Sequence, residues 1–362
     1  MSRRQFLKGV ATGLGAALAT PAIAQTAPAV SWRLTSSFPR TLDTIYGAAD
    51  TLARTVAELT ENRFKIQVFS AGEIVGGLQA LDAARSGTVE MAHTASSYYV
   101  GLDPTFAFGS VIPFSLNARQ MTAWFYEGGG KALLDAFYAR HGVVHLPGGN
   151  TGCQMAGWYR RELKSLDDLK GMKIRIPGLQ GQVMTRLGVV PQQIAGGDVF
   201  PALERGTIDA AEWVGPYDDE KLGFVRVAPY YYYPGWWEGG PMLNFFITEK
   251  KWQELPPAYQ SALAVAADRA HQQMLARYDD RNPAALKRLV SAGALLRLLP
   301  ADILQAAYQA TQELMTEISA KNETFKTIYE HLVAYRGDQT LWWQVAELHY
   351  DVFMVQNRQS KK

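Results

Sequence analysis

Short segments in which hydrophobic and polar residues alternate are interleaved with longer segments in which hydrophobic residues recur every three or four positions. Val30, Trp32 and Leu34 alternate as in a strand, whereas the hydrophobic residues from Ile45 to Leu59 are spaced by 4, 3, 4 and 3, the period of an amphipathic helix. The same reasoning predicts further strands at 64–68, 88–92, 172–176, 189–191, 243–247 and 295–299. Strands alternating with helices predict an α/β layer structure.

Two segments of the chain are similar to each other. Leu81–Glu90 and Ala202–Ala210 each contain the end of a helix, a glycine and the start of a strand. We interpret them as equivalent elements of two similar lobes. The alternative is a chance similarity, because this kind of junction is common.

The last third of the chain is predicted to be mostly helical. Helix is expected from Pro256 to the early 290s, with a possible break at Pro283, and again from Ala301 to near the end. In the final segment, hydrophobic residues again recur at steps of 4, 3, 4 and 3, and aromatic residues widen this face: Leu341, Trp342, Trp343, Val345, Leu348, Tyr350, Val352, Phe353 and Val355. Such a face would be poorly solvated, so we expect it to pack on the same chain or on a partner chain.

The N-terminus has the pattern of an export signal. Arg3, Arg4 and Lys8 precede an apolar run, and the small residues of Ala22–Ala24 would suit cleavage, so residues 1–24 are predicted to be a twin-arginine signal. The alternative is an uncleaved anchor, but the apolar run is shorter than the ~20 residues that a spanning helix needs. We therefore expect a periplasmic protein.

Composition and charge exclude several classes of function. The 362 residues suffice for two lobes, and the 48% of hydrophobic residues provide a sizeable core. Removing the three leader cations from the net charge of +2 leaves −1, so binding to nucleic acid is not indicated. Cys153 is the only cysteine, which excludes a disulfide scaffold. The sequence also lacks the serine elbow, zinc helix and complete phosphate loop of common enzyme families.

Candidate chemistry is concentrated between residues 150 and 238. Arg175 lies between Ile174 and Ile176, where a guanidinium at a strand end could bind a carboxylate, although an ordinary solvated or salt-bridged arginine is the alternative. The oxygen donors Gln154, Glu212 and Glu238 stand near tryptophans in the sequence. A carboxylate beside indoles is costly to desolvate unless a cation or donor satisfies it, which indicates a cation site; three unrelated surface residues are the alternative.

Several segments, taken together, resemble a known family. They are Phe69–Glu73, Ala80–Glu90, Lys173–Gly178 and Gly206–Trp213, with Trp236-Trp237-Glu238. The chain resembles the periplasmic solute receptors of tripartite ATP-independent periplasmic (TRAP) transporters, and more closely the receptors of this family that bind 2-oxo acids of the pyruvate type. The resemblance covers nearly all of the chain after the leader.

The resemblance implies an α/β fold of two hinge-linked lobes, as in periplasmic binding proteins, with a long C-terminal helical extension. Lobe I is expected at 25–150 and 241–290, and lobe II at 151–240. Residues 291–362 would form interlobe helices and a C-terminal helix that is exchanged between the chains of a homodimer.

The resemblance also implies roles for individual residues. Arg175 would pair with the ligand carboxylate and Asn150 would hydrogen-bond the ligand. Further ligand contacts are expected from Phe38, Tyr99, Gln154, Glu212 and Trp213. A cation, Na⁺ or alternatively Ca²⁺, would be held by Gln154, Glu212, the backbone carbonyl of Trp213, and Glu238.

Two functions are compatible with the sequence. The first is a receptor that binds a small 2-oxo acid, such as pyruvate, and delivers it to the membrane subunits of a TRAP transporter. The second is a secreted enzyme, such as a lyase, that uses Glu212 or Glu238 as a base. The absence of a recognisable catalytic constellation favours the receptor over the enzyme.

Overall fold

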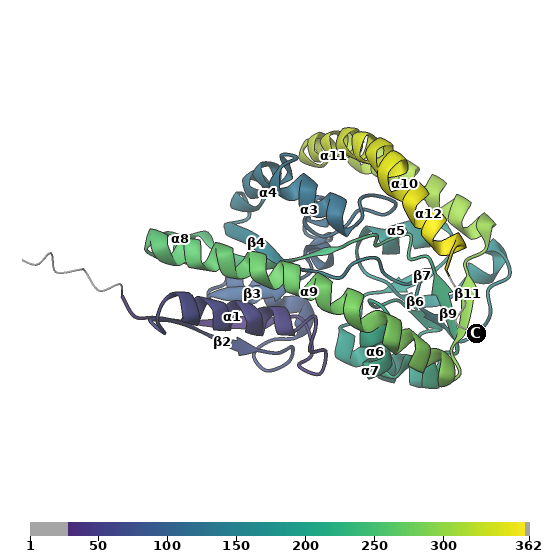
Figure 1. Cartoon of the computed structure of the whole chain (residues 1–362), viewed down its shortest axis with the longest axis horizontal. Coiled ribbons are helices and arrows are strands. Elements are labelled where there is room, and N and C mark those ends of the chain that lie inside the picture. The colour runs from purple at the N-terminus through teal and green to yellow at the C-terminus, as the bar shows by residue number, and fades with distance from the viewer. Residues whose placement is uncertain (1–27, 359–362) are drawn as a thin grey trace, which may run out of the picture.

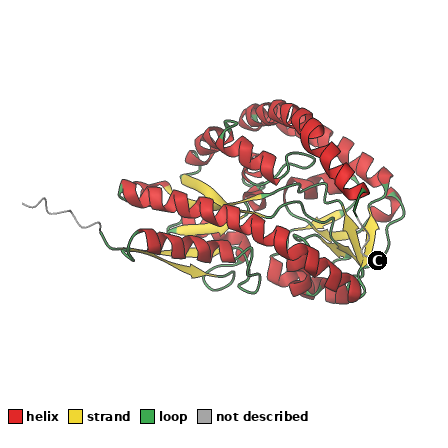
Figure 2. Ribbon diagram, in the orientation of Figure 1, coloured by secondary structure: helices red, strands yellow, loops and turns green. Residues whose placement is uncertain are grey.

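The computed structural model describes residues 28–358, which form two lobes with one sheet each (Figure 1). Helices surround the strands in both lobes (Figure 2). The prediction of an α/β fold with two lobes is thus confirmed. The expected export signal at 1–24 lies outside the described residues.

Lobe I is built on a five-stranded sheet with the order β2-β1-β3-β10-β4. Strand β1 pairs in parallel with β2 and β3, whereas β10 runs antiparallel to β3 and β4. The strands are β1 Val30–Ser36, β2 Phe64–Phe69, β3 Met91–Thr94, β4 Val143–Asn150 and β10 Met242–Thr248. Its helices are α1 Gly47–Leu59, α2 Ala80–Arg85, α3 Ala118–Tyr126, α4 Gly130–Ala139 and α8 Glu249–Gln253.

Lobe II is built on a six-stranded sheet with the order β11-β9-β5-β8-β6-β7. The strands are β5 Trp158–Tyr159, β6 Lys173–Arg175, β7 Val190–Gln192, β8 Ala210–Ala211, β9 Tyr230–Tyr233 and β11 Leu295–Leu298. The helices on this lobe are α5 Gly178–Arg186, α6 Gly196–Glu204, α7 Pro216–Leu222 and α10 Ala301–Lys321.

The two similar segments occupy equivalent places in the two sheets. Strand β3 and strand β8 each follow a helix and a glycine with positive φ, Gly87 at 76° and Gly206 at 71°. Each strand lies between one parallel and one antiparallel neighbour. The interpretation as equivalent elements is therefore confirmed, although β3 begins at Met91 rather than at Thr88.

Helix α9, Pro257–Ser291, runs along both lobes (Figure 1). It packs against α1 and β4 of lobe I and against α7 of lobe II. The possible break at Pro283 does not occur, because the helix continues through it. Tyr278 and Leu289 are buried on either side of Pro283, so packing on the lobes outweighs the ~3 kcal/mol that an interior proline costs.

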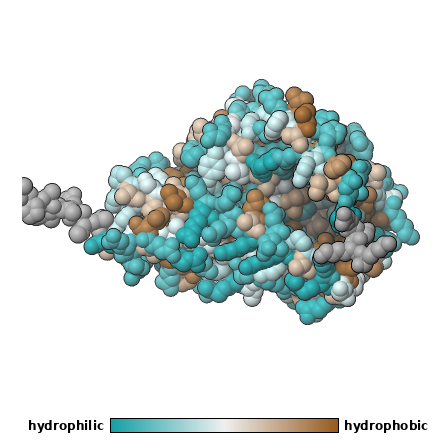
Figure 3. All heavy atoms as spheres, in the orientation of Figure 1, coloured by the Kyte–Doolittle hydropathy of each residue, from teal (hydrophilic) through white to brown (hydrophobic). Residues whose placement is uncertain are grey.

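The chain ends in α11, Glu323–Trp343, a π-helical turn Gln344–Leu348, and α12, His349–Gln356. The predicted apolar face is present but is largely exposed in the single chain, where Leu341, Trp342, Val345, Tyr350, Phe353 and Val355 are each more than half exposed. In Figure 3, hydrophobic residues gather near this end of the chain. Trp343 and Leu348 are partly buried, so the described chain covers only a small part of this face.

Candidate ligand site

A small cavity of about 30 Å³ lies where the two lobes meet. Lobe I contributes Phe38 and Ile45 from the loop after β1, and Tyr98 from the turn after β3. The walls from lobe II and its connections include Gln154, Arg175, Glu212, Trp213 and Glu238. Because side chains of both lobes nearly fill this space, the lobes are closed on it.

Arg175 is the last residue of β6, and its side chain is only 2% exposed. Its Nε donates to the carbonyl of Ile194 at 3.1 Å, and its Nη1 donates to the backbone carbonyl of Glu212 at 3.0 Å and to the Glu212 carboxylate. The guanidinium lies 4.8 Å from the centroid of a Trp213 ring, within range of a cation–π contact. Lys173 and Arg175 point to the same side of β6, but only Lys173, at the start of the strand, is exposed, whereas Arg175, at its end, reaches the carbonyls of Ile194 and Glu212 in the interior.

Two buried carboxylates lie near this one guanidinium, which forms an ion pair with Glu212 and also acts electrostatically on Glu238. Burial raises the pKa of Glu212 to about 7, against the opposing charge of Arg175. Burial, together with the neighbouring charge of Glu212, raises the pKa of Glu238 well above its ordinary value. Glu238 Oε1 accepts one hydrogen bond, from Gln180 Nε2 at 2.9 Å. When both carboxylates are ionised, the site carries excess negative charge, which a cation or a proton must neutralise.

Gln154 supplies a further oxygen beside this pair. Its Nε2 donates to Thr151 Oγ1 at 2.9 Å, which orients the amide, while its buried Oε1 has no hydrogen-bond partner within residues 28–358. Its backbone N–H donates to the carbonyl of Glu238 at 3.0 Å, so the two residues are held together. Carboxylate and amide oxygens suit Na⁺ or Ca²⁺.

The donor set of the site therefore fits an alkali or alkaline-earth cation. Among the described residues, no three or more His, Cys, Asp or Glu side chains are grouped so that they alone could hold a metal ion. Two carboxylates, one amide oxygen and one backbone carbonyl are instead the expected donors, and this all-oxygen chemistry differs from that of a zinc or copper site.

Most of the expected site residues meet at the cavity, but two lie elsewhere. Phe38, Gln154, Arg175, Glu212, Trp213 and Glu238 line the cavity, and Asn150 and Tyr99 do not. The Asn150 amide donates to the carbonyl of Gly240 at 3.0 Å and accepts from the N–H of Gly152 at 2.8 Å. It thus fastens the two chain segments that cross between the lobes.

Tyr99 points into lobe I rather than toward the cavity. Its hydroxyl accepts from the N–H of Leu81 at 3.0 Å and lies 3.1 Å from Thr94 Oγ1. Its neighbour Tyr98 lines the cavity instead. Both residues belong to the 3₁₀ turn Ser96–Tyr99, in which successive side chains point about 120° apart. The tyrosine pair was visible in the sequence, but no sequence signal distinguished its two members.

Sequence reasoning also missed Gln180 and Asp218. Gln180 is fully buried on α5 and donates to Glu238. Asp218 lies behind Trp213, whose indole Nε1 is 3.4 Å from Asp218 Oδ2. Neither residue belongs to the motifs that carried the resemblance, and their roles depend on contacts between elements far apart in the chain.

Comparisons with known proteins agree with this architecture. Residues 35–322 match the model of the bacterial extracellular solute-binding proteins, family 7. A monocarboxylate 2-oxoacid-binding periplasmic protein of Nostoc sp. is 47% identical over 360 residues, covering 98% of this chain and 99% of its own.

Two solved structures are also similar over most of the chain. One is a TRAP transporter solute-binding protein from Bordetella bronchiseptica with copurified calcium and picolinate, 48% identical with a TM-score of 0.89, which covers 91% of this chain and 98% of its own. The other is a TRAP periplasmic solute-binding protein from Pseudoalteromonas atlantica with bound sodium and pyruvate. It is 36% identical with a TM-score of 0.86 and covers 89% of this chain and 98% of its own. The chain therefore belongs to family 7 of the bacterial extracellular solute-binding proteins, the solute receptors of TRAP transporters.

Proposed function

We propose that the protein is a periplasmic receptor that binds a small 2-oxo acid, such as pyruvate, together with a bridging cation, and delivers it to TRAP membrane subunits. The observation that carries this proposal is the buried group of Arg175, Glu212 and Glu238, which combines one guanidinium with two carboxylates at the interlobe cavity. The relatives that bind pyruvate or picolinate with sodium or calcium support the same chemistry. No helix among residues 28–358 is long and apolar enough to cross a membrane.

Each group at the cavity then has a distinct task. Arg175 would bind the ligand carboxylate, for which its planar guanidinium is well suited. Gln154, Glu212, Glu238 and the Trp213 carbonyl would hold the cation, which supplies the positive charge that two carboxylates opposite one guanidinium lack. Phe38 and Tyr98, from lobe I, would cover the ligand when the lobes close.

A bridging cation predicts that the binding of sodium and the binding of the ligand are coupled. If sodium bridges the carboxylates and the ligand, each increases the affinity for the other by the same factor. Calorimetric titration of metal-free protein with pyruvate should show at least a roughly tenfold loss of affinity when choline replaces sodium at constant ionic strength. An unchanged affinity would contradict the bridging cation, and restoration by added calcium alone would identify Ca²⁺ as the ion.

The enzyme alternative is not favoured, because the family to which the chain belongs consists of solute-binding receptors. Glu212 and Glu238 face a guanidinium and an amide rather than a histidine or a nucleophile. Incubation with pyruvate and sodium, followed by NMR, should show an unchanged spectrum of the ligand.

The exposed apolar face of the C-terminal helix supports the further proposal of a homodimer with exchanged helices. Leu341, Trp342, Val345 and Phe353 would be buried by a second chain, and the relative from B. bronchiseptica is described as a dimer. Light scattering over about two decades of concentration should give the mass of a dimer for the full-length protein. Ending the chain after Thr340, which keeps the buried part of α11, should give a monomer; a monomeric full-length protein would exclude this assembly.

A further inference from the structure

A second contact between the lobes lies outside the cavity, at Asp43. This residue belongs to the loop between β1 and α1, whose other side supplies Phe38 and Ile45 to the cavity wall. The Asp43 side chain is half exposed and does not line the cavity. The same loop of lobe I therefore faces the expected ligand on one side and carries a carboxylate on the other.

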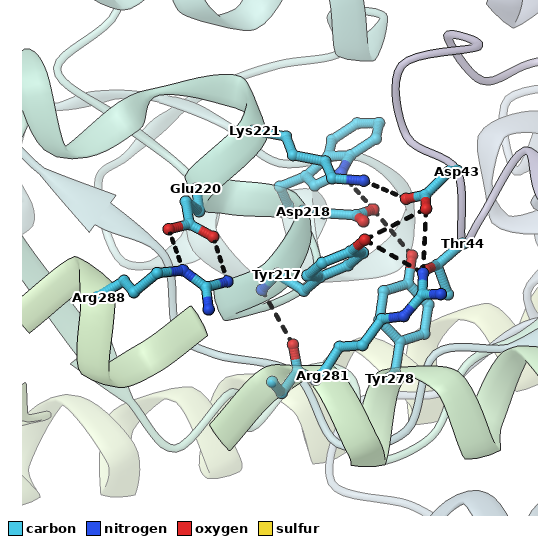
Figure 4. Close-up of polar contacts among 11 residues, drawn as sticks. Asp43, Thr44, Tyr217, Asp218, Glu220, Lys221, Tyr278, Arg281 and Arg288 are labelled. Carbon is cyan, nitrogen blue, oxygen red and sulfur yellow. Dashed lines mark hydrogen bonds and ion pairs between the residues drawn. The ribbon is translucent and has the colours of Figure 1, made fainter. Parts of the chain in front are cut away.

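The Asp43 carboxylate reaches residues of α7 and α9 (Figure 4). It forms an ion pair with Lys221 Nζ and accepts a hydrogen bond from Tyr217 Oη at 3.2 Å, and both partners belong to α7 of lobe II. Arg281 Nη1, on α9, is 3.0 Å from Asp43 Oδ2. Two cations and one phenol thus converge on a single carboxylate that belongs to the opposite lobe.

The partners of Asp43 are themselves packed together. The Tyr217 ring has Lys221 Nζ 4.1 Å and the Arg281 guanidinium 5.0 Å from its centroid. Arg281 also reaches Thr44 Oγ1 at 3.2 Å, on the loop of lobe I. Burial acts to raise the pKa of Asp43, but Lys221, and after it Arg281, outweigh this effect and hold that pKa below its ordinary value. Asp43 is therefore ionised at neutral pH.

A neighbouring ion pair provides an internal reference. Glu220, the residue of α7 before Lys221, forms two hydrogen bonds of 2.7 Å with Arg288 of α9 (Figure 4). This pair connects the same two helices and is also partly exposed, but it includes no residue of the loop between β1 and α1. Loss of the Glu220 pair should weaken α7–α9 packing without releasing the loop over the cavity.

We propose that Asp43 is a positioning residue for ligand binding, which fastens the loop 37–46 of lobe I to α7 of lobe II when the lobes are closed. By holding this loop, it keeps Phe38 and Ile45 against the cavity and slows the escape of the ligand. The proposal rests on the proposed function in so far as the cavity binds a small carboxylate. Asp43 would thus affect ligand affinity without contacting the ligand or the cation.

The test compares Asp43→Asn with Glu220→Gln in the full-length protein. With pyruvate and sodium, Asp43→Asn should weaken binding about 5- to 10-fold, as expected for the loss of a partly exposed charge network. Stopped-flow tryptophan fluorescence should place most of this loss in a faster dissociation of pyruvate. Glu220→Gln should leave both quantities within about twofold of wild type. Equal effects of the two variants, or no effect of Asp43→Asn, would overturn the proposal.

A variant of Lys221, the partner of Asp43, tests the same contact from the other side. Lys221→Met should weaken binding less in the Asp43→Asn background than alone, because the two residues act through one contact.

Small-angle X-ray scattering of ligand-free protein should give a larger radius of gyration for Asp43→Asn than for Glu220→Gln and wild type. If wild-type protein fails to bind pyruvate, the proposed function is wrong, but the scattering experiment still tests the role of Asp43. Equal radii of gyration for the three proteins would refute the proposed role of Asp43.

Discussion

Lobe II contains two pairs of buried carboxylates whose surroundings differ. Glu212 and Glu238 lie at the cavity with 2% and 6% of their surface exposed, and Asp218 and Asp219, at the start of α7, are 0% and 1% exposed. Asp218 Oδ2 accepts a hydrogen bond from the Tyr278 hydroxyl at 2.8 Å and lies near the Trp213 indole. Asp219 Oδ2 accepts from the Tyr231 hydroxyl at 2.7 Å and from the Trp158 indole at 2.9 Å. The aspartates thus meet neutral donors, whereas Glu212 accepts from the Arg175 guanidinium and Glu238 accepts from the Gln180 amide.

The comparison shows that burial and a raised pKa do not by themselves identify a ligand site. Burial raises the pKa of Asp218 to about 6 and that of Asp219 to about 7, in the same direction as for Glu212. What differs is access, because the glutamates line a cavity and the aspartates do not. An enclosed pair can be neutralised by a proton, whereas a pair that faces a cavity can bind a cation.

The largest effect is expected from Arg175→Lys. Lysine keeps the charge but loses the planar guanidinium, so the affinity for pyruvate should fall by about 2–5 kcal/mol, as for other buried charged hydrogen bonds. Calorimetric titration of the folded variant measures this loss. Asp219→Asn, which changes the enclosed pair, should retain affinity close to wild type. Unchanged binding in Arg175→Lys would remove this residue from the site.

Glu238→Gln tests whether the pair Glu212 and Glu238 binds sodium and the pair Asp218 and Asp219 does not. The variant keeps the size of the side chain but removes one of the charges that would hold the cation, so pyruvate affinity in sodium should fall about tenfold, or ~1.4 kcal/mol. Replacing sodium with choline should then have little further effect. Asp219→Asn should retain the full sodium dependence of wild type. A Glu238→Gln variant with wild-type sodium dependence would place the cation elsewhere.

A smaller effect is expected on the pH dependence of the ligand-free protein. Asp219 has a folded-state pKa of about 7, above the ordinary 3.8, so its contribution to stability is fully present below pH ~4 and is lost as the pH rises through 7. The melting temperature should therefore decrease between pH 5 and pH 8 without sodium. Asp219→Asn should reduce this decrease by about 1–2 °C for each ~1 kcal/mol of the Asp219 contribution, the conversion expected for a protein of this size. Identical slopes would show that Asp219 is ionised throughout this range.

Local sequence patterns sufficed for much of the fold. The periods of two and of three to four predicted β1, α1, β2 and β10 within a few residues, because these elements bury one face against a core. Pro283 shows where local reasoning stopped, since the helix is maintained by packing on two lobes that its own sequence does not reveal.

At the site, the residue types were readable from the sequence, whereas their contact partners depend on how the chain folds. Arg175, Glu212 and Glu238 could be selected because a strand pattern and a family resemblance marked them, and the structure brings them to one cavity. The choice between Tyr98 and Tyr99 depended on the direction of a single turn. The contact between Asp43 and Lys221 joins residues 178 positions apart on opposite lobes. Such pairings arise only when the elements pack, because no local preference of the chain encodes which distant charges will meet.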